Sequence, residues 1–177
     1  MQRPQLEHII RAAAGITGAT EFVVVGSQAI LGQFPQAPQE LLASIEADVF
    51  SLRSEADSDL IDGSIGEGSP FHQTFGYYAH GVGAETAVLP EGWRERLIPV
   101  RNENTGGGAG LCLEVHDLAV SKLVAGREKD EAFVTGLLRH HLAKPETIQA
   151  RISQTPLVAE RRELCLARLQ RLMSLAG

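Results

Sequence analysis

The sequence predicts an α+β fold, in which a mixed β-sheet flanked by helices is followed by a C-terminal helical segment. Between residues 20 and 115, short apolar runs alternate with turns rich in glycine and proline. From His116 onward, apolar residues recur at helical spacing. A chain of 177 residues with 44% hydrophobic content can build one core. We therefore expect residues 1–115 to form an α/β core with an N-terminal helix, and residues 116–177 to pack on it within a single compact domain.

The N-terminal elements are predicted from helical periodicity and from a β-branched run. Leu6, Ile9 and Ile10 recur at helical spacing, whereas Phe22–Val25 lacks polar alternation, as in a strand that is covered on both faces. The expected elements are a helix over 5–14, a break over 15–20, a strand over 21–25, a short helix over 27–31 with Ser27 as its N-cap, a loop over 33–39 and a helical turn over 40–43.

A second strand, over residues 44–50, carries two acidic residues. Because side chains alternate across a strand, Glu46 and Asp48 are expected on one face, and Ile45, Ala47 and Val49 on the other. Two neighbouring carboxylates repel each other unless a positive group lies between them. A divalent cation that prefers oxygen ligands, such as Mg²⁺, would fill that role.

The rest of the chain is expected to complete the sheet as a meander of antiparallel strands and then to turn helical. The expected elements are a helix over 57–65 ended by Gly63 or Gly66, strands over 76–81, 86–89 and 96–100, a turn over 90–92, a flexible loop over 102–110 and a strand over 111–115. Four helices follow, one around 118–124, one around 133–138, one opened by Pro145 and one over 157–175.

Composition limits the class of protein. The net charge is −6, which argues against a dedicated nucleic-acid-binding protein. Cys112 and Cys165 lie far apart in apolar segments and are interpreted as buried residues in a reducing compartment. The N-terminus is polar, and the longest apolar runs are too short to span a bilayer, so we expect a cytoplasmic protein without a membrane segment. The phosphate-binding fingerprints of Rossmann and P-loop folds do not occur.

The first pattern that suggests chemistry joins the turn Gly26-Ser27 to the pair Glu46-x-Asp48. A small residue after the first strand lets backbone N–H groups approach a phosphate. A metal held by paired carboxylates neutralises phosphate charge, which is most of what phosphoryl-type transfer requires. The alternative interpretation is a solvent-facing strand edge with two unrelated acids.

The second pattern lies in the helical segment. It consists of Asp117 and Lys122, followed by Arg127, Lys129 and Asp130. On one continuous helix Lys122 and Lys129 would share a face, and Arg127 could pair with Asp130. A cationic face opposite the carboxylates would hold a triphosphate. The alternative is a solvated amphipathic helix with ordinary charge pairs.

Taken together, these residues resemble the nucleotidyltransferase superfamily, which has the polymerase-β-like fold. Its pattern is a hydrophobic strand, Gly-[Gly/Ser], a spacer and [Asp/Glu]-x-[Asp/Glu], here Val25-Gly26-Ser27 followed by Glu46-Ala47-Asp48. The chain is most similar to small bacterial AbiEii-like, abortive-infection nucleotidyltransferases. Their added motifs correspond here to Asp117…Lys122 and to Arg127-x-Lys129-Asp130. The resemblance covers roughly residues 20–135.

The resemblance implies a Mg²⁺-dependent transfer of a nucleoside monophosphate from an NTP to a hydroxyl on RNA or tRNA, a protein or a small molecule. It also implies a toxin–antitoxin or phage-defence role, with a cognate antitoxin as a partner, and leaves a homo-oligomer open. The implied catalytic residues are Glu46, Asp48, Lys122 and Asp130, of which Glu46 and Asp48 bind the metal. The implied nucleotide-binding residues are Gly26, Ser27, Lys122, Arg127 and Lys129.

Three departures from the family pattern leave a second function open. The spacer between Ser27 and Glu46 has 18 residues, the first acid is Glu, and no third carboxylate is evident. His80 is the polar residue in the strand expected to carry that third acid, with Glu85 and Glu114 as other options, although the six histidines as a group show no metal-binding spacing. The alternative is therefore a catalytically inactive binding or regulatory protein. Metal-dependent phosphatase or nuclease chemistry is a third option.

Overall fold

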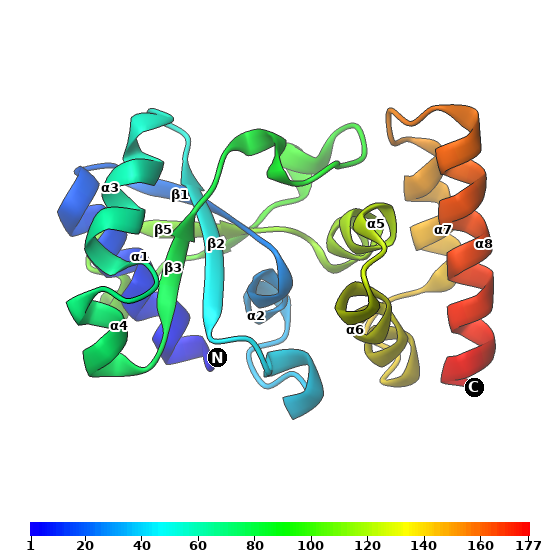
Figure 1. Cartoon of the computed structure of the whole chain (residues 1–177), viewed down its shortest axis with the longest axis horizontal. Helices are drawn as coiled ribbons and strands as arrows, with labels where there is room; N and C mark the ends of the chain where they lie inside the picture. The colour runs from blue at the N-terminus through cyan, green and yellow to red at the C-terminus, as the bar shows by residue number, and fades with distance from the viewer.

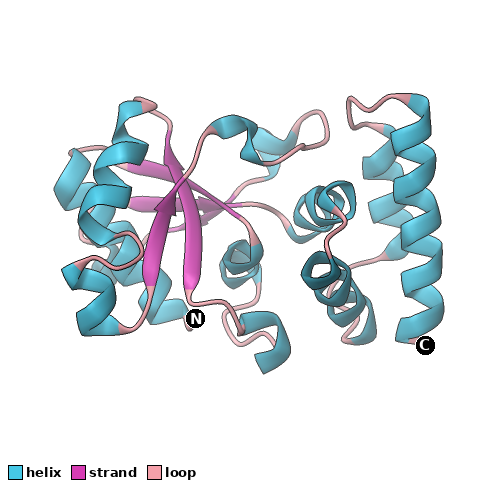
Figure 2. Cartoon of the chain, in the orientation of Figure 1, coloured by secondary structure: helices cyan, strands magenta, loops and turns pink.

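The computed structural model describes residues 1–177 and confirms the α+β class. Figures 1 and 2 show one mixed sheet with helices on both faces and a helical C-terminal part. The sheet has the strand order β3-β2-β1-β5-β4. Its strands are β1 (Glu21–Val25), β2 (Glu46–Ser51), β3 (Tyr78–Gly81), β4 (Ile98–Val100) and β5 (Ala109–Cys112). The helices are α1 (Arg3–Thr17), α2 (Ile30–Gln33), α3 (Ala56–Ile65), α4 (Pro70–Phe75), α5 (Val115–Ala125), α6 (Glu128–Arg139), α7 (Pro145–Ser153) and α8 (Ala159–Ala176).

The β1 strand is the centre of the sheet. It pairs antiparallel with β2 and parallel with β5, and Phe22, Val23 and Val24 have no exposed surface. Helices α1 and α3 pack on one face of the sheet, and α2 and α5 lie on the other (Figure 1). This double cover explains why β1 contains only apolar residues after Glu21, as its sequence indicates.

The expected antiparallel meander is wrong. β3 runs parallel to β2, and only the pairs β1–β2 and β4–β5 are antiparallel. A parallel pair needs a crossover connection, and α3 and α4 supply it between β2 and β3. The expected strand over 86–89 does not form, because residues 84–86 make a 3-10 turn and Leu89 is buried as part of an irregular connection.

Several element boundaries differ from the expected ones. β2 begins at Glu46, so Ile45 precedes the strand and is 47% exposed rather than facing the core. β5 spans 109–112, and Val115 already belongs to α5, which Glu114 caps through the backbone N–H of His116. The N-cap of the turn at 27–29 is Gly26, not Ser27. Helix α4, begun by Pro70 and capped by Ser69, is an addition to the expected elements.

The four C-terminal helices form as predicted. Helices α5 and α6 lie between the sheet and the pair α7–α8 (Figure 1), and buried residues of all four helices join the same hydrophobic cluster as the sheet. Gly126 ends α5 in the left-handed conformation, with φ of 63°, so α5 and α6 are separate helices. Cys112 and Cys165 are buried free thiols, as predicted. None of the helices combines the length and the apolar character that crossing a membrane requires.

Candidate functional site

A cavity of about 840 Å³ lies between the sheet and helices α5 and α6. From the sheet side it is lined by Ser27, Glu46, Asp48 and His80. From the helical side it is lined by Lys122, Arg127, Lys129 and Phe133. The structure thus brings the two patterns of the sequence, which are far apart in the chain, to opposite walls of one cavity.

The two carboxylates leave the same face of β2. Ala47 and Val49 are buried on the opposite face, whereas Glu46 and Asp48 keep part of their side chains exposed toward the cavity. This is the alternation that the sequence predicts for these four residues. A solvated strand edge does not describe the pair, because β2 is an inner strand between β1 and β3.

The third residue of the cluster is His80, on β3. Parallel pairing aligns Glu46 with Tyr78 and Asp48 with His80. The Nδ1 atom of His80 lies 3.0 Å from Oε1 of Glu46 and 3.2 Å from Oδ1 of Asp48. Among the options for the position of a third acid, the structure therefore places His80 beside the pair. Neither Glu85 nor Glu114 lines the cavity.

The electrostatics of the cluster favour a bound cation. Burial, followed by the charge of Glu46, raises the pKa of Asp48, and His80 only partly opposes this. For His80, burial lowers the pKa, but the hydrogen bond to Asp48 and the charge of Asp62 outweigh it, so the pKa is raised. One ligand atom from each of Glu46, Asp48 and His80 lies within 4.8 Å of the others. Two carboxylates and one imidazole at such distances fit a divalent cation.

Gly26 allows Asp48 to occupy its place. The backbone of Gly26 has φ of 67° and ψ of −171°, a region that essentially only glycine adopts. A Cβ atom at this position would lie 2.1 Å from Oδ2 of Asp48. Since Val25 pairs with Asp48 across β1 and β2, the Gly26-Ser27 turn passes directly against that carboxylate. The glycine of the predicted turn is therefore required by the neighbouring acid as well as by the turn.

Tyr78 is a site residue that the sequence analysis does not single out. Its hydroxyl donates to Oε2 of Glu46 at 3.3 Å. Burial, with the nearby charges of Glu46 and Glu67, raises the pKa of Tyr78 to about 12, so the hydroxyl stays protonated and remains a donor. The alternation of side chains along a strand could have identified it, because residues two positions apart share a face. Tyr78 and His80 share one face of β3, as Glu46 and Asp48 do on β2.

On the helical wall, one buried acid holds two of the cations. Asp130 has no exposed surface; Oδ1 accepts Nζ of Lys122 at 3.1 Å, and Oδ2 accepts Nε of Arg127 at 2.6 Å. Burial raises the pKa of Asp130, but Arg127 and Lys122 together bring it below its usual value. Asp130 also caps α6 through the backbone N–H of Arg127. Lys129 is exposed at the cavity and forms no ion pair.

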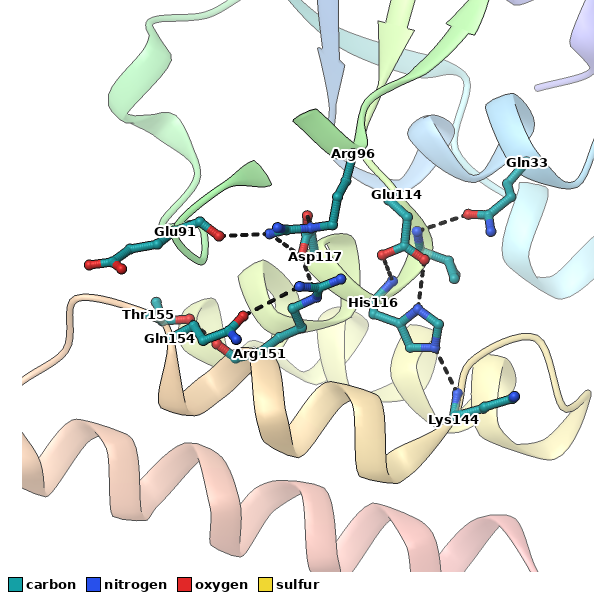
Figure 3. Close-up of polar contacts among 11 residues, drawn as sticks. Gln33, Glu91, Arg96, Glu114, His116, Asp117, Lys144, Arg151, Gln154 and Thr155 are labelled. Carbon is teal, nitrogen blue, oxygen red and sulfur yellow. Dashed lines mark hydrogen bonds and ion pairs between the residues drawn. The ribbon is translucent and has the colours of Figure 1, made fainter. Parts of the chain in front are cut away.

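Asp117 lies outside the cavity, although the motif in the sequence groups it with Lys122. Figure 3 shows its carboxylate between two guanidinium groups, with Nε of Arg96 at 2.8 Å and Nε of Arg151 at 3.4 Å. Asp117 has no exposed surface, and these contacts join the segment before β4 to α5 and α7. Its position is that of a structural residue.

Glu114 is engaged nearby in a similar way. It accepts Nδ1 of His116 at 2.6 Å, and Nε2 of His116 in turn accepts the backbone N–H of Lys144 (Figure 3). The hydrogen bond to His116 outweighs burial and lowers the pKa of Glu114. This chain of contacts fixes the start of α7 relative to α5.

Comparisons with known proteins give a family and nothing finer. No curated protein and no solved structure matches the chain significantly. A family model described as nucleotidyltransferase of unknown function (DUF6036) matches residues 4–143, which include both walls of the cavity. The resemblance to nucleotidyltransferases that the motifs suggest is thereby confirmed at the level of this family, while AbiEii-like closeness stays a prediction. The chain belongs to the DUF6036 family of nucleotidyltransferases of unknown function.

Proposed function

We propose that this protein transfers a nucleoside monophosphate from an NTP to a hydroxyl group in a reaction that depends on a divalent cation such as Mg²⁺. The observation that carries the proposal is the cavity itself, in which Glu46 and Asp48 on one wall face Lys122, Arg127 and Lys129 on the other. Phosphoryl-type transfer is mostly positioning and charge neutralisation, and this arrangement offers both.

Each wall has a separate task in this reaction. Glu46 and Asp48 would hold the cation, which supplies Lewis-acid stabilisation of the charge on the phosphate oxygens. The Gly26-Ser27 turn opens the 3-10 turn at 27–29 and brings backbone close to the carboxylates, where a phosphate can approach. Lys129, which has no intramolecular partner, is the cation most available to a phosphate, and Lys122 and Arg127 share one negative charge between them.

The bonds exchanged are those of nucleotidyl transfer. The acceptor oxygen forms a bond to the α-phosphorus, the bond from that phosphorus to the bridging oxygen breaks, and pyrophosphate leaves. The proton of the hydroxyl is released to solvent. Holding the acceptor and the α-phosphorus in line is the contribution expected from the cavity walls.

The proposal specifies the acceptor and the pathway less closely than it specifies the reaction. RNA or tRNA, a protein or a small molecule each presents a suitable hydroxyl, and the net charge of −6 gives no general attraction to nucleic acid. A toxin–antitoxin or phage-defence role, with a cognate antitoxin as partner, is the biological role that we propose on the strength of the AbiEii-like motifs. Incubation with labelled NTPs and cellular RNA or lysate would identify the acceptor by the molecule that gains the label.

A second candidate is a catalytically inactive nucleotidyltransferase fold that binds a nucleotide or a partner. The specific observation in its favour is that a histidine, His80, rather than a third acid lies beside Asp48 on the neighbouring strand. An inactive member would still bind a nucleotide but would transfer no label to any acceptor.

Binding and transfer are tested on one pair of variants. In the wild type, a metal–NTP complex that binds only the folded state raises the melting temperature. Asp48→Asn should abolish that rise and any label transfer while leaving the fold intact. Asp59→Asn, which removes an exposed carboxylate on α3, is the matched control and should behave like the wild type. If Asp48→Asn binds and transfers as well as the wild type, the proposed site is wrong.

A further inference from the structure

We propose that His80 is a ligand of the bound metal and makes this site select a first-row transition cation of the Mn²⁺ class over Mg²⁺. The inference rests on the proposed function, because it concerns the identity of the cation that Glu46 and Asp48 hold. It goes beyond the resemblance to nucleotidyltransferases, which implies a third carboxylate and no histidine ligand.

The donor atoms converge on one point. Oε1 of Glu46 and Oδ1 of Asp48 lie 3.0 Å and 3.2 Å from Nδ1 of His80. The other oxygen of each carboxylate faces elsewhere, since Oε2 of Glu46 accepts the hydroxyl of Tyr78 and Oδ2 of Asp48 lies against Gly26. Each carboxylate thus presents one oxygen to His80. The three atoms form a set of two oxygens and one nitrogen.

Sheet register, rather than loop conformation, fixes this geometry. β2 and β3 pair in parallel, so Asp48 and His80 occupy aligned positions on the same face of neighbouring strands. Gly81 follows at once, and a Cβ there would lie 2.1 Å from the backbone oxygen of Ser58 on α3. The backbone N–H of Gly81 also donates to Asp62 of the same helix at 2.8 Å. Contacts with α3 therefore hold the end of β3 that carries His80.

No lysine or arginine forms an ion pair with either of the two carboxylates. Lys122 and Arg127, on the opposite wall, are bound to Asp130, and Lys129 makes no ion pair. The polar groups within reach of Glu46 and Asp48 are His80 and the hydroxyl of Tyr78. Two adjacent carboxylates with a single imidazole between them retain negative charge, which a divalent cation would neutralise.

An imidazole ligand changes which divalent cation the site binds more tightly. Mg²⁺ prefers oxygen ligands in octahedral geometry, whereas imidazole nitrogen suits transition metals. Mn²⁺ binds carboxylates, as Mg²⁺ does, and also binds imidazole. It can therefore be coordinated by all three donors. Replacement of His80 by Asp restores a third oxygen donor and should shift the preference back toward Mg²⁺.

The experiment measures metal binding without any reaction. Titration calorimetry of the metal-free full chain with Mn²⁺ and with Mg²⁺ gives the ratio of the two dissociation constants. Electron spin-echo spectroscopy of bound Mn²⁺ detects a directly coordinated imidazole nitrogen. The variants are His80→Asp and, as the matched control, His141→Asn, which removes an exposed imidazole at a positive-φ position that asparagine tolerates.

The wild type and His141→Asn should bind Mn²⁺ more tightly than Mg²⁺ and show the nitrogen signal. His80→Asp should lose that signal and reduce the Mn²⁺-to-Mg²⁺ preference by about tenfold, a change of about 1.4 kcal/mol. Bound Mn²⁺ without a nitrogen signal in the wild type, or an unchanged preference in His80→Asp, overturns this inference and leaves the proposed function standing. If neither metal binds the wild type, both the inference and the proposed metal-dependent function fail.

Discussion

Replacing Gly26 by alanine should destroy the metal site while the fold persists. The new Cβ would lie 2.1 Å from Oδ2 of Asp48, whereas an ordinary contact begins at 3.4 Å. The carboxylate must therefore move by roughly 1.3 Å, the difference between these distances. Metal–ligand distances tolerate about ±0.2 Å, so such a shift removes Asp48 from the donor set.

The same substitution also strains the backbone, and a control must separate the two effects. The conformation of Gly26 costs a non-glycine residue about 1–3 kcal/mol. Gly76 has φ of 75°, and a Cβ there meets nothing within 4 Å, so Gly76→Ala costs about 1–2 kcal/mol of left-handed strain with no clash. For a chain of this size, 1 kcal/mol lowers the melting temperature by about 2–4 °C. Both variants should therefore melt several degrees below the wild type.

The assay that distinguishes them is the rise in melting temperature on adding metal. At one hundred times the dissociation constant, a ligand of the folded state stabilises by about 2.7 kcal/mol, or about 5–11 °C here. The wild type and Gly76→Ala should show the full rise, and Gly26→Ala none. A full rise in Gly26→Ala would mean that Asp48 does not hold the metal, and the assignment of the site would be refuted.

Three further variants test the surroundings of the site. Tyr78→Phe removes the donor to Glu46 and should weaken metal binding by about 10- to 100-fold in calorimetry, with an unchanged circular-dichroism spectrum. Lys129→Ala should weaken nucleotide binding about tenfold without changing the melting temperature, while the exposed Lys144→Ala leaves both unchanged. Asp130→Asn breaks a buried ion-pair cluster and should cost about 3–5 kcal/mol in urea unfolding. Because the pKa of Asp130 is lowered in the folded state, its contribution is present above its unfolded pKa of about 3.9 and is lost as the pH falls further, so the variant should show a shallower acid loss of stability.

Sequence periodicity was sufficient to predict those elements of the fold whose pattern of burial is set by their own secondary structure. The apolar run of β1, the alternation around Ala47 on β2 and the four C-terminal helices follow from periods of two and 3.6 residues. The parallel pairing of β3 with β2 did not follow, because it depends on the crossover through α3 and α4 and on long-range packing. The expected strand over 86–89 failed for a related reason: an apolar pair such as Val88 and Leu89 can be covered in a connection without joining a sheet.

The same distinction applies to the site. Glu46 and Asp48 could be placed on one face from their spacing alone, but the partner that completes their cluster comes from the register of a different strand. The sequence motif groups Asp117 with Lys122, but the two residues do not belong to the same site. Lys122 lies five positions after Asp117, which on a helix is a rotation of about 140°, so the two side chains point to different sides of α5. Lys122 reaches the cavity, whereas Asp117 meets Arg96 and Arg151.

The buried carboxylate of Asp130, on the helical wall of the cavity, contributes both to the stability of the fold and to the proposed binding site. It caps α6, ties Lys122 on α5 to that helix, and directs Arg127 beside the same cavity. Two cations that share one acid leave a surplus of one positive charge, and Lys129 adds another. The sheet wall carries the opposite sign in Glu46 and Asp48. The metal-bound nucleoside triphosphate of the proposed function has the matching charge pattern, because it presents negative groups to the helices and can share its cation with the sheet.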